Sequence, residues 1–391
     1  MNWKIPLSDL RLTQADRDAV MAALESNWLT MGERTQNFER LFADALDPAN
    51  PPHCFAVGNC TVGLHMALAA VGVGPGDEVI VPSLTFVATA NAALYCGATV
   101  VLADVTGPND WTLSVADVAA KITPRTKAIV PVHFAGQPCD MVALLALGKQ
   151  HNIAIVEDNA HGPLADGWID ATQASRALGT IGEIGCFSFF SNKNMTTGEG
   201  GMVVTRDKAL AEKLRLLRAH GMTTLTLDRH KGHAFSYDVV ELGFNYRIDE
   251  MRAAMGITQL ERLPANNALR AQVVAWYNDA LAAIPGVIVP FAQRPAQGRQ
   301  ALHIMPVLLP EGVAREAVQI ALRDAGIQTS IHYRPIHTFS WHSQSERLRR
   351  DGLAKTDALT PRILTLPLFP AMTQDDVQTV ATALQAALVG L

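Results

Sequence analysis

Short apolar runs rich in valine and isoleucine alternate with longer amphipathic stretches between residues 54 and 205. The stretches between the runs are long enough for crossover helices. This alternation predicts an α/β fold of three layers (αβα), with helices on both faces of a buried, mainly parallel, seven-stranded sheet. The seven runs are CFAVGN (54–59), EVIVPS (78–83), TVVLADV (99–105), AIVPVHF (128–134), AIVEDN (154–159), GCFSFF (185–190) and GGMVVT (200–205).

Helical periodicity outside this region predicts helices over residues 13–26, 33–46, 249–263 and 314–326. Pro264 follows the third of these and predicts its end. The remaining segment mixes helical and strand patterns, including the apolar run 364–370, and predicts a smaller C-terminal α/β domain. We therefore expect a large domain over residues 1–263 and a small domain over residues 264–391.

The composition fits a folded enzyme, because 49% of the 391 residues are hydrophobic and 18% are charged. A chain of this length can bury one large core and a smaller one. The net charge of −5 provides no general electrostatic attraction for nucleic acid or an anionic membrane. Anionic ligands must therefore be bound by local groups.

Residues 1–14 lack the basic start and apolar core of a secretory signal, and no run of about 18 apolar residues occurs. The five cysteines are odd in number and lack CxxC spacing, which indicates reduced thiols rather than disulfides or metal ligands. We expect a cytoplasmic protein without a metal site.

Lys193 and Asp158 form the most informative pair in the chain. Lys193 lies in a polar, glycine-bounded loop (188–201), and Asp158 ends an apolar run upstream of it. Pyridoxal phosphate (PLP) requires an amine that holds its aldehyde as a Schiff base and an anion that keeps its ring nitrogen protonated. Taken singly, the lysine could be a solvated surface charge and the aspartate a turn cap, but a surface lysine does not explain the surrounding polar cluster.

Other candidates follow neighbouring apolar runs. The amides of Cys60 and Thr61 and the Thr61 hydroxyl begin a helical pattern and could bind a phosphate, although an ordinary threonine N-cap is the alternative. The Ser188 hydroxyl could reach the same phosphate. Phe86 could stack on the pyridine ring or be a core aromatic, and His161 could contact the 3-oxygen of the cofactor, stack nearby or be a buried core residue.

With these residues in view, the chain resembles the DegT/DnrJ/StrS family of PLP-dependent nucleotide-sugar aminotransferases, which have the aspartate aminotransferase-like fold called fold type I. The number and order of the matching blocks carry the resemblance. They are residues 28–32, 58–68, 74–92, 130–141, 155–162, 188–205, 242–263, 331–337 and 364–370.

The resemblance implies that Lys193 is the Schiff-base lysine and that Asp158 is the partner of the pyridine nitrogen. It further implies that Phe86 stacks on the ring and that His161 lies near the 3-oxygen. The implied phosphate contacts are Cys60, Thr61 and Ser188. It also implies that Asn245 reaches the phosphate from the neighbouring subunit of a homodimer with shared active sites. The chain departs from the family at its usual S-G-T-A-A-L phosphate loop, which here begins Asn59-Cys60-Thr61. Backbone binding of phosphate can survive this change, whereas a binding role for the side chain at position 59 is in doubt.

The family's activity implies transfer of an amino group, with L-glutamate as donor and a nucleotide-diphosphate keto-hexose as acceptor. A pyrophosphate needs cationic partners, and a sugar needs polar ones. The candidates are Arg229, Lys231, Arg247 and Arg334 for the pyrophosphate and His332, Tyr333 and His337 for the sugar.

Four alternatives compete with this function. A sugar dehydratase of the same family typically carries histidine at the Schiff-base position, where this chain has Lys193. A cyclitol ketone could replace the nucleotide sugar, and a regulatory protein could bind PLP without turnover. A dinucleotide-dependent oxidoreductase would need GxGxxG after the first run, where the chain reads GNCTVG.

Overall fold

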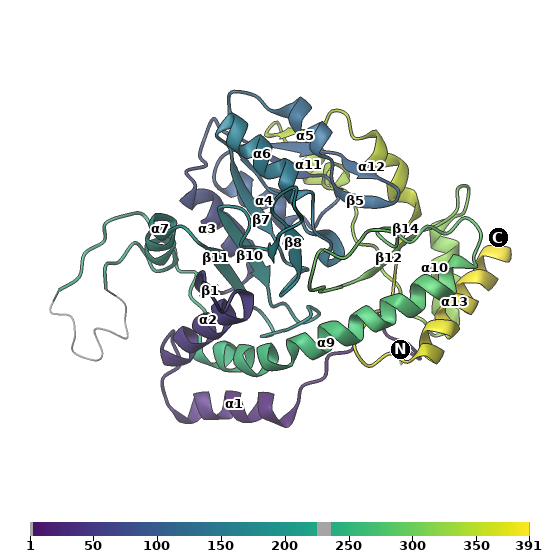
Figure 1. Ribbon diagram of the computed structural model, residues 1–391, viewed down its shortest axis with the longest axis horizontal. Coiled ribbons are helices and arrows are strands. Elements are labelled where there is room, and N and C mark those ends of the chain that lie inside the picture. The colour runs from purple at the N-terminus through teal and green to yellow at the C-terminus, as the bar shows by residue number, and fades with distance from the viewer. Residues whose placement is uncertain (1–2, 225–235, 391) are drawn as a thin grey trace.

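The computed structural model describes residues 3–224 and 236–390, and an eight-stranded sheet lies at its centre (Figure 1). All seven predicted runs form strands of this sheet. The eighth strand, β13, was missed because it is only two residues long and shows no periodicity. From edge to edge the strands are β1 (His53–Val57), β11 (Gly201–Thr205), β10 (Ile184–Ser188), β7 (Ala154–Asp158), β6 (Thr126–Ile129), β2 (Glu78–Pro82), β3 (Thr99–Ala103) and β13 (Leu348–Arg349).

The sheet is parallel except for one strand. β11 runs antiparallel to both of its neighbours, β1 and β10, and every other pair of adjacent strands is parallel. The carboxyl ends of β1, β2, β6, β7 and β10 therefore lie along the same edge. In open sheets of this kind ligands bind at that edge.

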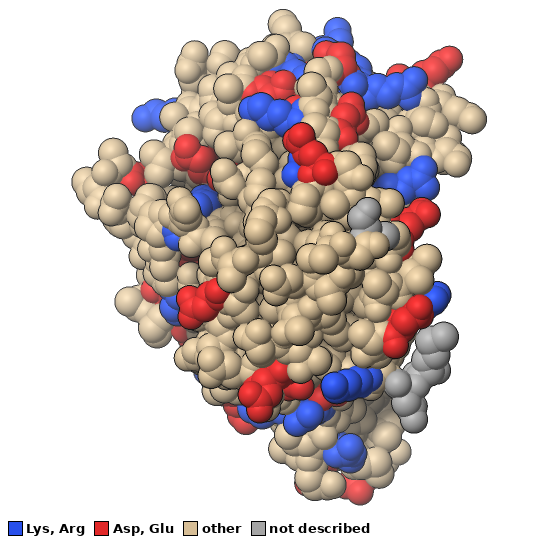
Figure 2. Space-filling view, turned by 90° about the vertical axis from the view of Figure 1, so that its right-hand side faces the viewer, with Lys and Arg blue, Asp and Glu red and all other residues tan. Residues whose placement is uncertain are grey.

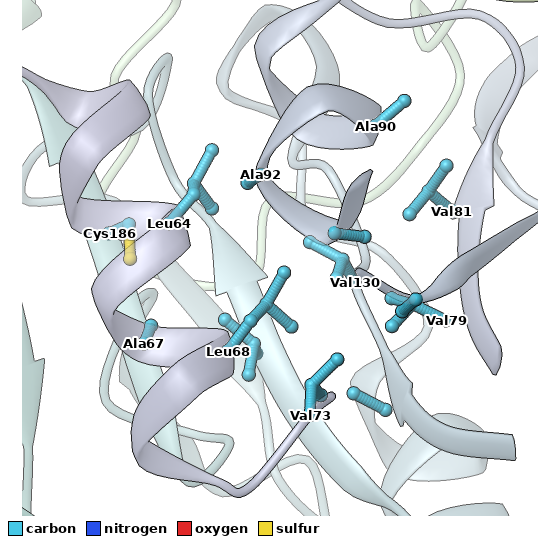
Figure 3. Packing of buried hydrophobic residues seen from close by; sticks show 14 of the residues in the cluster. Leu64, Ala67, Leu68, Val73, Val79, Val81, Ala90, Ala92, Val130 and Cys186 are labelled. Atoms are coloured by element: carbon cyan, nitrogen blue, oxygen red, sulfur yellow. The ribbon is translucent and has the colours of Figure 1, made fainter. Parts of the chain in front are cut away.

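Successive residues of each central strand point to opposite faces, and helices cover both faces. Val79 and Val81 of β2 share a core with Leu64 and Leu68 of the helix α3 (Cys60–Ala70) (Figure 3), whereas Ile80 between them packs with the helices α5 (Val115–Lys121) and α6 (Met141–His151). This period of two is typical of a strand that is buried on both sides. The covering helices are α3 (Cys60–Ala70), α4 (Ala88–Tyr95) and α7 (Lys208–Arg218) on one face and α5 (Val115–Lys121) and α6 (Met141–His151) on the other.

The longest helix, α9 (Glu250–Ala282), continues through Pro264, so the helix end predicted there is wrong. A proline inside a helix removes one backbone hydrogen bond and costs roughly 3 kcal/mol. Packing on both sides of the proline opposes this cost. Leu260 is buried against α2 (Glu33–Leu46), while Val273 and Tyr277 are buried in a second core. The division of the chain at residues 263 and 264 stays a prediction.

That second core belongs to the last third of the chain, where helices pack on a small antiparallel sheet. The predicted patterns over 314–326 and 364–370 form α10 and β14, as expected. The elements are β12 (Met305–Leu308), β14 (Ile363–Leu366), α10 (Arg315–Asp324), α13 (Gln374–Val389) and the second half of α9.

The remaining elements surround these two cores. Helix α1 (Gln14–Glu25) lies along α9 (Figure 1), and the buried Asp16 in its first turn pairs with Arg262 of that helix. The others are the hairpins β4 (Val105–Gly107) with β5 (Asp110–Leu113) and β8 (Asp166–Trp168) with β9 (Ser175–Ala177), and the helices α11 (Ser340–Gln344) and α12 (Ala354–Leu359).

Charged side chains of both signs are interspersed over the face drawn in Figure 2. None of the helices in the described ranges is long and apolar enough to cross a membrane. All five cysteines carry free thiols.

Candidate active site

A cavity of about 610 Å³ opens at the carboxyl edge of the large sheet. Segments that follow β1, β2, β7 and β10 meet there, together with a loop from the last third of the chain. Nine of the residues singled out from the sequence line it, namely Cys60, Thr61, Phe86, Asp158, His161, Ser188, Lys193, His332 and Tyr333.

Lys193 lies in the loop after β10, and its ammonium group is poorly solvated. Burial lowers the pKa of this amine to about 8, and the nearby Asp158 is among the groups that oppose the shift. A buried amine loses its proton more readily because the charged form has left water. A larger fraction of Lys193 is therefore neutral and nucleophilic near neutral pH than is usual for a lysine.

Asp158 ends β7, and its side chain is held from two directions. The Thr89 hydroxyl of α4 donates to Oδ2 at 2.7 Å, and the backbone N–H of Ala160 donates to Oδ1 at 3.2 Å. Burial raises the pKa of this carboxyl, whereas these hydrogen bonds and the charge of Lys193 lower it. Each carboxylate oxygen can accept a further hydrogen bond, so the group can still bind a cationic N–H.

The helix α3 points its N-terminus at the cavity. Its N-cap is Asn59, whose Oδ1 accepts from the N–H of Val62 at 3.0 Å, so the alternative of a Thr61 N-cap is wrong. The asparagine that departs from the family's phosphate loop therefore has a capping role. The first N–H groups of a helix have no acceptor within it, and those of Cys60 and Thr61 are placed to bind an anion.

A glycine on the neighbouring strand permits this arrangement. A Cβ added to Gly201 of β11 would lie 2.8 Å from the carbonyl carbon of Asn59 and 2.9 Å from the amide nitrogen of Cys60. Both neighbours are backbone atoms, which cannot move aside cheaply. A bare Cα at this position lets the strand approach the first turn of α3, next to Ser188 at the end of β10.

His161 and Tyr333 form a coupled pair in the wall of the cavity. The backbone N–H of Ala135 donates to Nδ1 of His161 at 3.1 Å, so the neutral ring carries its proton on Nε2. That Nε2–H group then donates to the Tyr333 hydroxyl at 2.8 Å, and burial lowers the pKa of His161 well below its ordinary value. The hydroxyl hydrogen of Tyr333 remains available for a ligand.

Phe86 and His332 complete the polar and aromatic lining. Phe86 is 56% exposed at the mouth of the cavity, with its ring centroid 5.9 Å from that of Tyr333. Burial lowers the pKa of His332 to about 4, and its Nδ1 hydrogen-bonds the Thr365 hydroxyl at 3.0 Å. The imidazole of His332 is therefore neutral at physiological pH.

Several candidate residues lie away from this lining. Arg334 is exposed and bonds Thr338, and His337 bonds Ser83 and Asp357. Asn245 is exposed and accepts from Nε of Arg247 at 3.0 Å. Arg229 and Lys231 fall outside the described residues.

The structure also brings two residues to the site that the sequence did not reveal. Thr89 lies one helical turn after Phe86, in the segment that follows β2. Its position shortly after the end of a strand was the sequence signal that could have revealed it. His303 lies 3.4 Å from Lys193, measured from Nε2 to Nζ. It is distant in sequence and belongs to no recognisable motif, so only the fold reveals it.

These groups match the parts of PLP. Lys193 offers an amine for the aldehyde, Asp158 has free acceptor capacity for the ring nitrogen, and the first turn of α3 lines the cavity beside Ser188, where its free N–H groups can bind the phosphate. The aromatic ring of Phe86 stands at the mouth. The residues present therefore fit this cofactor.

Comparison with known proteins agrees with this fit. The chain matches the DegT/DnrJ/EryC1/StrS aminotransferase family over residues 11–385. It is 39% identical to GDP-perosamine synthase of Caulobacter vibrioides, with 99% of each chain covered. It is 37% identical to the spore coat polysaccharide biosynthesis protein SpsC of Bacillus subtilis, with 100% of this chain and 98% of the relative covered.

A solved structure extends the match to the fold and the cofactor. The putative sugar aminotransferase Spr1654 of Streptococcus pneumoniae in its pyridoxamine phosphate (PMP) form has a TM-score of 0.88 and 26% identity, covering 99% of this chain and 100% of that one. The same protein is known in a PLP form. The predicted fold and cofactor are thus confirmed, and this chain belongs to the DegT/DnrJ/EryC1/StrS family of PLP-dependent aminotransferases.

Proposed function

We propose that this enzyme moves an amino group from L-glutamate to the carbonyl carbon of a nucleotide-diphosphate-linked keto sugar, in the biosynthesis of amino sugars. The observation that carries the proposal is the shared cavity of Lys193 and Asp158, in which burial lowers the pKa of the lysine to about 8. The names of the relatives support the sugar class, since one is a GDP-perosamine synthase and another acts in polysaccharide biosynthesis.

Each part of the cofactor has a proposed partner. Lys193 holds it covalently, Asp158 receives the ring nitrogen, and the amides of Cys60 and Thr61 with the Ser188 hydroxyl bind the phosphate. Phe86 stacks on the ring, and the pair of His161 and Tyr333 provides the hydrogen-bond donor at the 3-oxygen. When bound, PLP supplies an aldehyde that exchanges amino groups and a ring that takes up electrons.

The protein's own residues then direct the proton transfers. Asp158 keeps its negative charge against the ring nitrogen and thereby holds a proton there. Nζ of Lys193, once free, would carry a proton from the α-carbon of the amino donor to C4′ of the cofactor, and in the second half of the cycle it would carry a proton from C4′ to the acceptor carbon. A well-placed general acid or base accelerates such a step by about 10²- to 10⁴-fold.

We also propose a homodimer with shared active sites. The mouth of the cavity exposes large apolar side chains, with Phe86 at 56%, Tyr95 at 61% and Phe190 at 44% exposure. A second subunit seated there would cover them and would bring Asn245 of the partner subunit toward the phosphate.

His332 and Tyr333 face the sugar in this arrangement, and Arg247 is a candidate for the pyrophosphate. A cytoplasmic location stays a prediction.

The decisive experiment supplies the purified protein with PLP and glutamate and screens nucleotide-linked 3-keto and 4-keto hexoses by mass spectrometry. Replacement of a carbonyl oxygen by an amino group supports the proposal, and Lys193→Ala must abolish it. Normal conversion by Lys193→Ala refutes the role of Lys193. Conversion of cyclitol ketones alone identifies a cyclitol aminotransferase, and absence of turnover with all carbonyl substrates identifies a PLP-binding regulatory protein.

A further inference from the structure

His303 is a buried histidine that reaches the active site from the last third of the chain. It is 4% exposed and lies two residues before β12. Its backbone N–H donates to the carbonyl oxygen of Ala135 at 3.0 Å, and its own carbonyl oxygen accepts from Nη1 of Arg270 at 3.1 Å. Its ring centroid lies 4.5 Å from that of His161. The ring is therefore fixed in position.

A chain of side-chain amides fixes the protonation of this ring as well. The carbonyl oxygen of Pro163 can only accept, so Nδ2 of Asn267 donates to it, at 3.1 Å. Oδ1 of Asn267 then accepts from Nδ2 of Asn194 at 2.9 Å, which leaves Oδ1 of Asn194 to accept from Nδ1 of His303 at 3.1 Å. The ring consequently carries its proton on Nδ1 and a lone pair on Nε2.

The lone pair faces Lys193. Nε2 of His303 lies 3.4 Å from Nζ, and it is the one hydrogen-bond partner of that amine within residues 3–224 and 236–390. The carboxylate of Asp158 and the thiol of Cys60 act on the same amine electrostatically. Burial keeps His161, His303 and His332 uncharged, because it lowers the pKa of each imidazole.

We propose that His303 is a positioning residue that holds Nζ of Lys193 whenever this amine is not joined to the cofactor. The proposal rests on the proposed role of Lys193 as the cofactor-binding lysine. A free lysine side chain samples many rotamers, and a fixed acceptor at one point restricts them. With one N–H group held by His303, the amine stays close to the position from which it attacks the cofactor and moves protons.

Two substitutions separate the acceptor from the rest of the ring. His303→Gln can keep an acceptor at the position of Nε2, whereas His303→Asn can keep the donor to Asn194 but has no atom near Nζ. We expect covalent attachment of PLP to the apoenzyme, trapped with borohydride and located by peptide mass spectrometry, to slow by up to about 100-fold in His303→Asn. His303→Gln should stay within about threefold of the wild type.

The pH dependence of PLP attachment is a second measurement, and its midpoint would stay unchanged if the role of His303 were only structural. An acceptor favours the ammonium form, which has more N–H groups to donate, so its loss in His303→Asn should shift the midpoint of attachment to lower pH. His303→Gln should keep the wild-type midpoint. If His303→Asn does not fold, Asn194→Ala removes the group that fixes the ring and should shift the midpoint in the same direction.

The outcomes distinguish this inference from the proposed function. Attachment at wild-type rate and midpoint in both His303 variants overturns the positioning role while leaving Lys193 as the cofactor lysine. Equal slowing in both variants with an unchanged midpoint also overturns it, because the effect is then structural. Attachment of PLP at another lysine, unaffected in Lys193→Ala, refutes the proposed function itself.

Discussion

At the scale of single residues, the proposed mechanism depends on side chains that adjust two charges. Asp158 must remain ionised although it is buried, and Lys193 must become neutral near physiological pH. The sequence singled out both as candidates, because each lies at or after the end of a predicted strand of the sheet. It did not identify Thr89 or His303, which stabilise them, because a hydrogen bond between distant segments leaves no local pattern.

Removal of the Thr89 hydroxyl tests the support of Asp158. Thr89→Val keeps the shape of the side chain but leaves Oδ2 of the buried carboxylate without its 2.7 Å donor. A hydrogen bond to a charged group contributes about 1.5–3 kcal/mol, so PLP affinity should fall by at least about tenfold. A titration of the apoenzyme by fluorescence measures this. Thr356→Val is the matched control, because the Thr356 hydroxyl also donates to a buried carboxylate, that of Asp104, but does not line the cavity.

The lowered pKa of Lys193 predicts how cofactor uptake depends on pH. Only the neutral amine attacks an aldehyde, and burial disfavours the ammonium form, so the attachment rate should rise with pH and level off above about pH 8. An ordinary lysine, with a pKa of about 10.4, would still be accelerating there. Stopped-flow absorbance of the apoenzyme over this range shows which profile applies, and continued acceleration beyond about pH 9 would contradict the assignment.

At the scale of secondary structure, the sequence specified elements and their ends well where a local signal existed. The helices at 13–26 and 33–46 and all seven runs of the sheet were predicted from periodicity. The failure at Pro264 has a different origin, because buried contacts of α9 on both sides of the proline outweigh a lost hydrogen bond. Packing between elements that are distant in sequence decides whether a helix continues through a proline. A rule based on neighbouring residues takes no account of this packing.

The proposed phosphate site depends on the close contact between β11 and the first turn of α3. Gly201→Ala places a methyl group within 2.9 Å of backbone atoms of Asn59, Cys60 and Phe187. Overpacking of this kind costs about 1–3 kcal/mol, so thermal unfolding should occur at a lower temperature and PLP affinity should fall. Gly74→Ala is the control, since a Cβ there meets nothing within 4 Å. Equal stability of the two variants would contradict the close approach.

At the scale of the whole molecule, the candidate active site is lined by segments of the large sheet and by a loop from the last third of the chain. Arg270, which is buried in α9, donates to the carbonyl oxygens of His303 and Leu368 and so connects the second core to the loop beside Lys193. The two-domain division stays a prediction, and no pattern in the sequence predicted this connection. Contacts between segments about a hundred residues apart emerge only from the folded arrangement.

A shared active site predicts that two defective subunits can complement each other. Lys193→Ala lacks the proposed cofactor lysine, and Asn245→Asp would place a negative charge beside the phosphate of the partner's site if Asn245 has its proposed role. If Lys193 of one subunit works with Asn245 of the other, a hybrid dimer contains one intact site. Random mixing should then restore about one quarter of wild-type activity. Activity no greater than the sum of the two parent variants would show that the sites are not shared.

The short strand β13 has a consequence for biosynthesis on the ribosome. It borders β3, which lies at the rim of the sheet until residues 348 and 349 arrive. The other seven strands are complete at residue 205, so during translation the nearly finished sheet presents an unpaired strand edge until residues 348 and 349 are added, and such edges favour association with other nascent chains. A shortage of chaperones should therefore promote aggregation of nascent chains of this protein that have not yet reached residue 349.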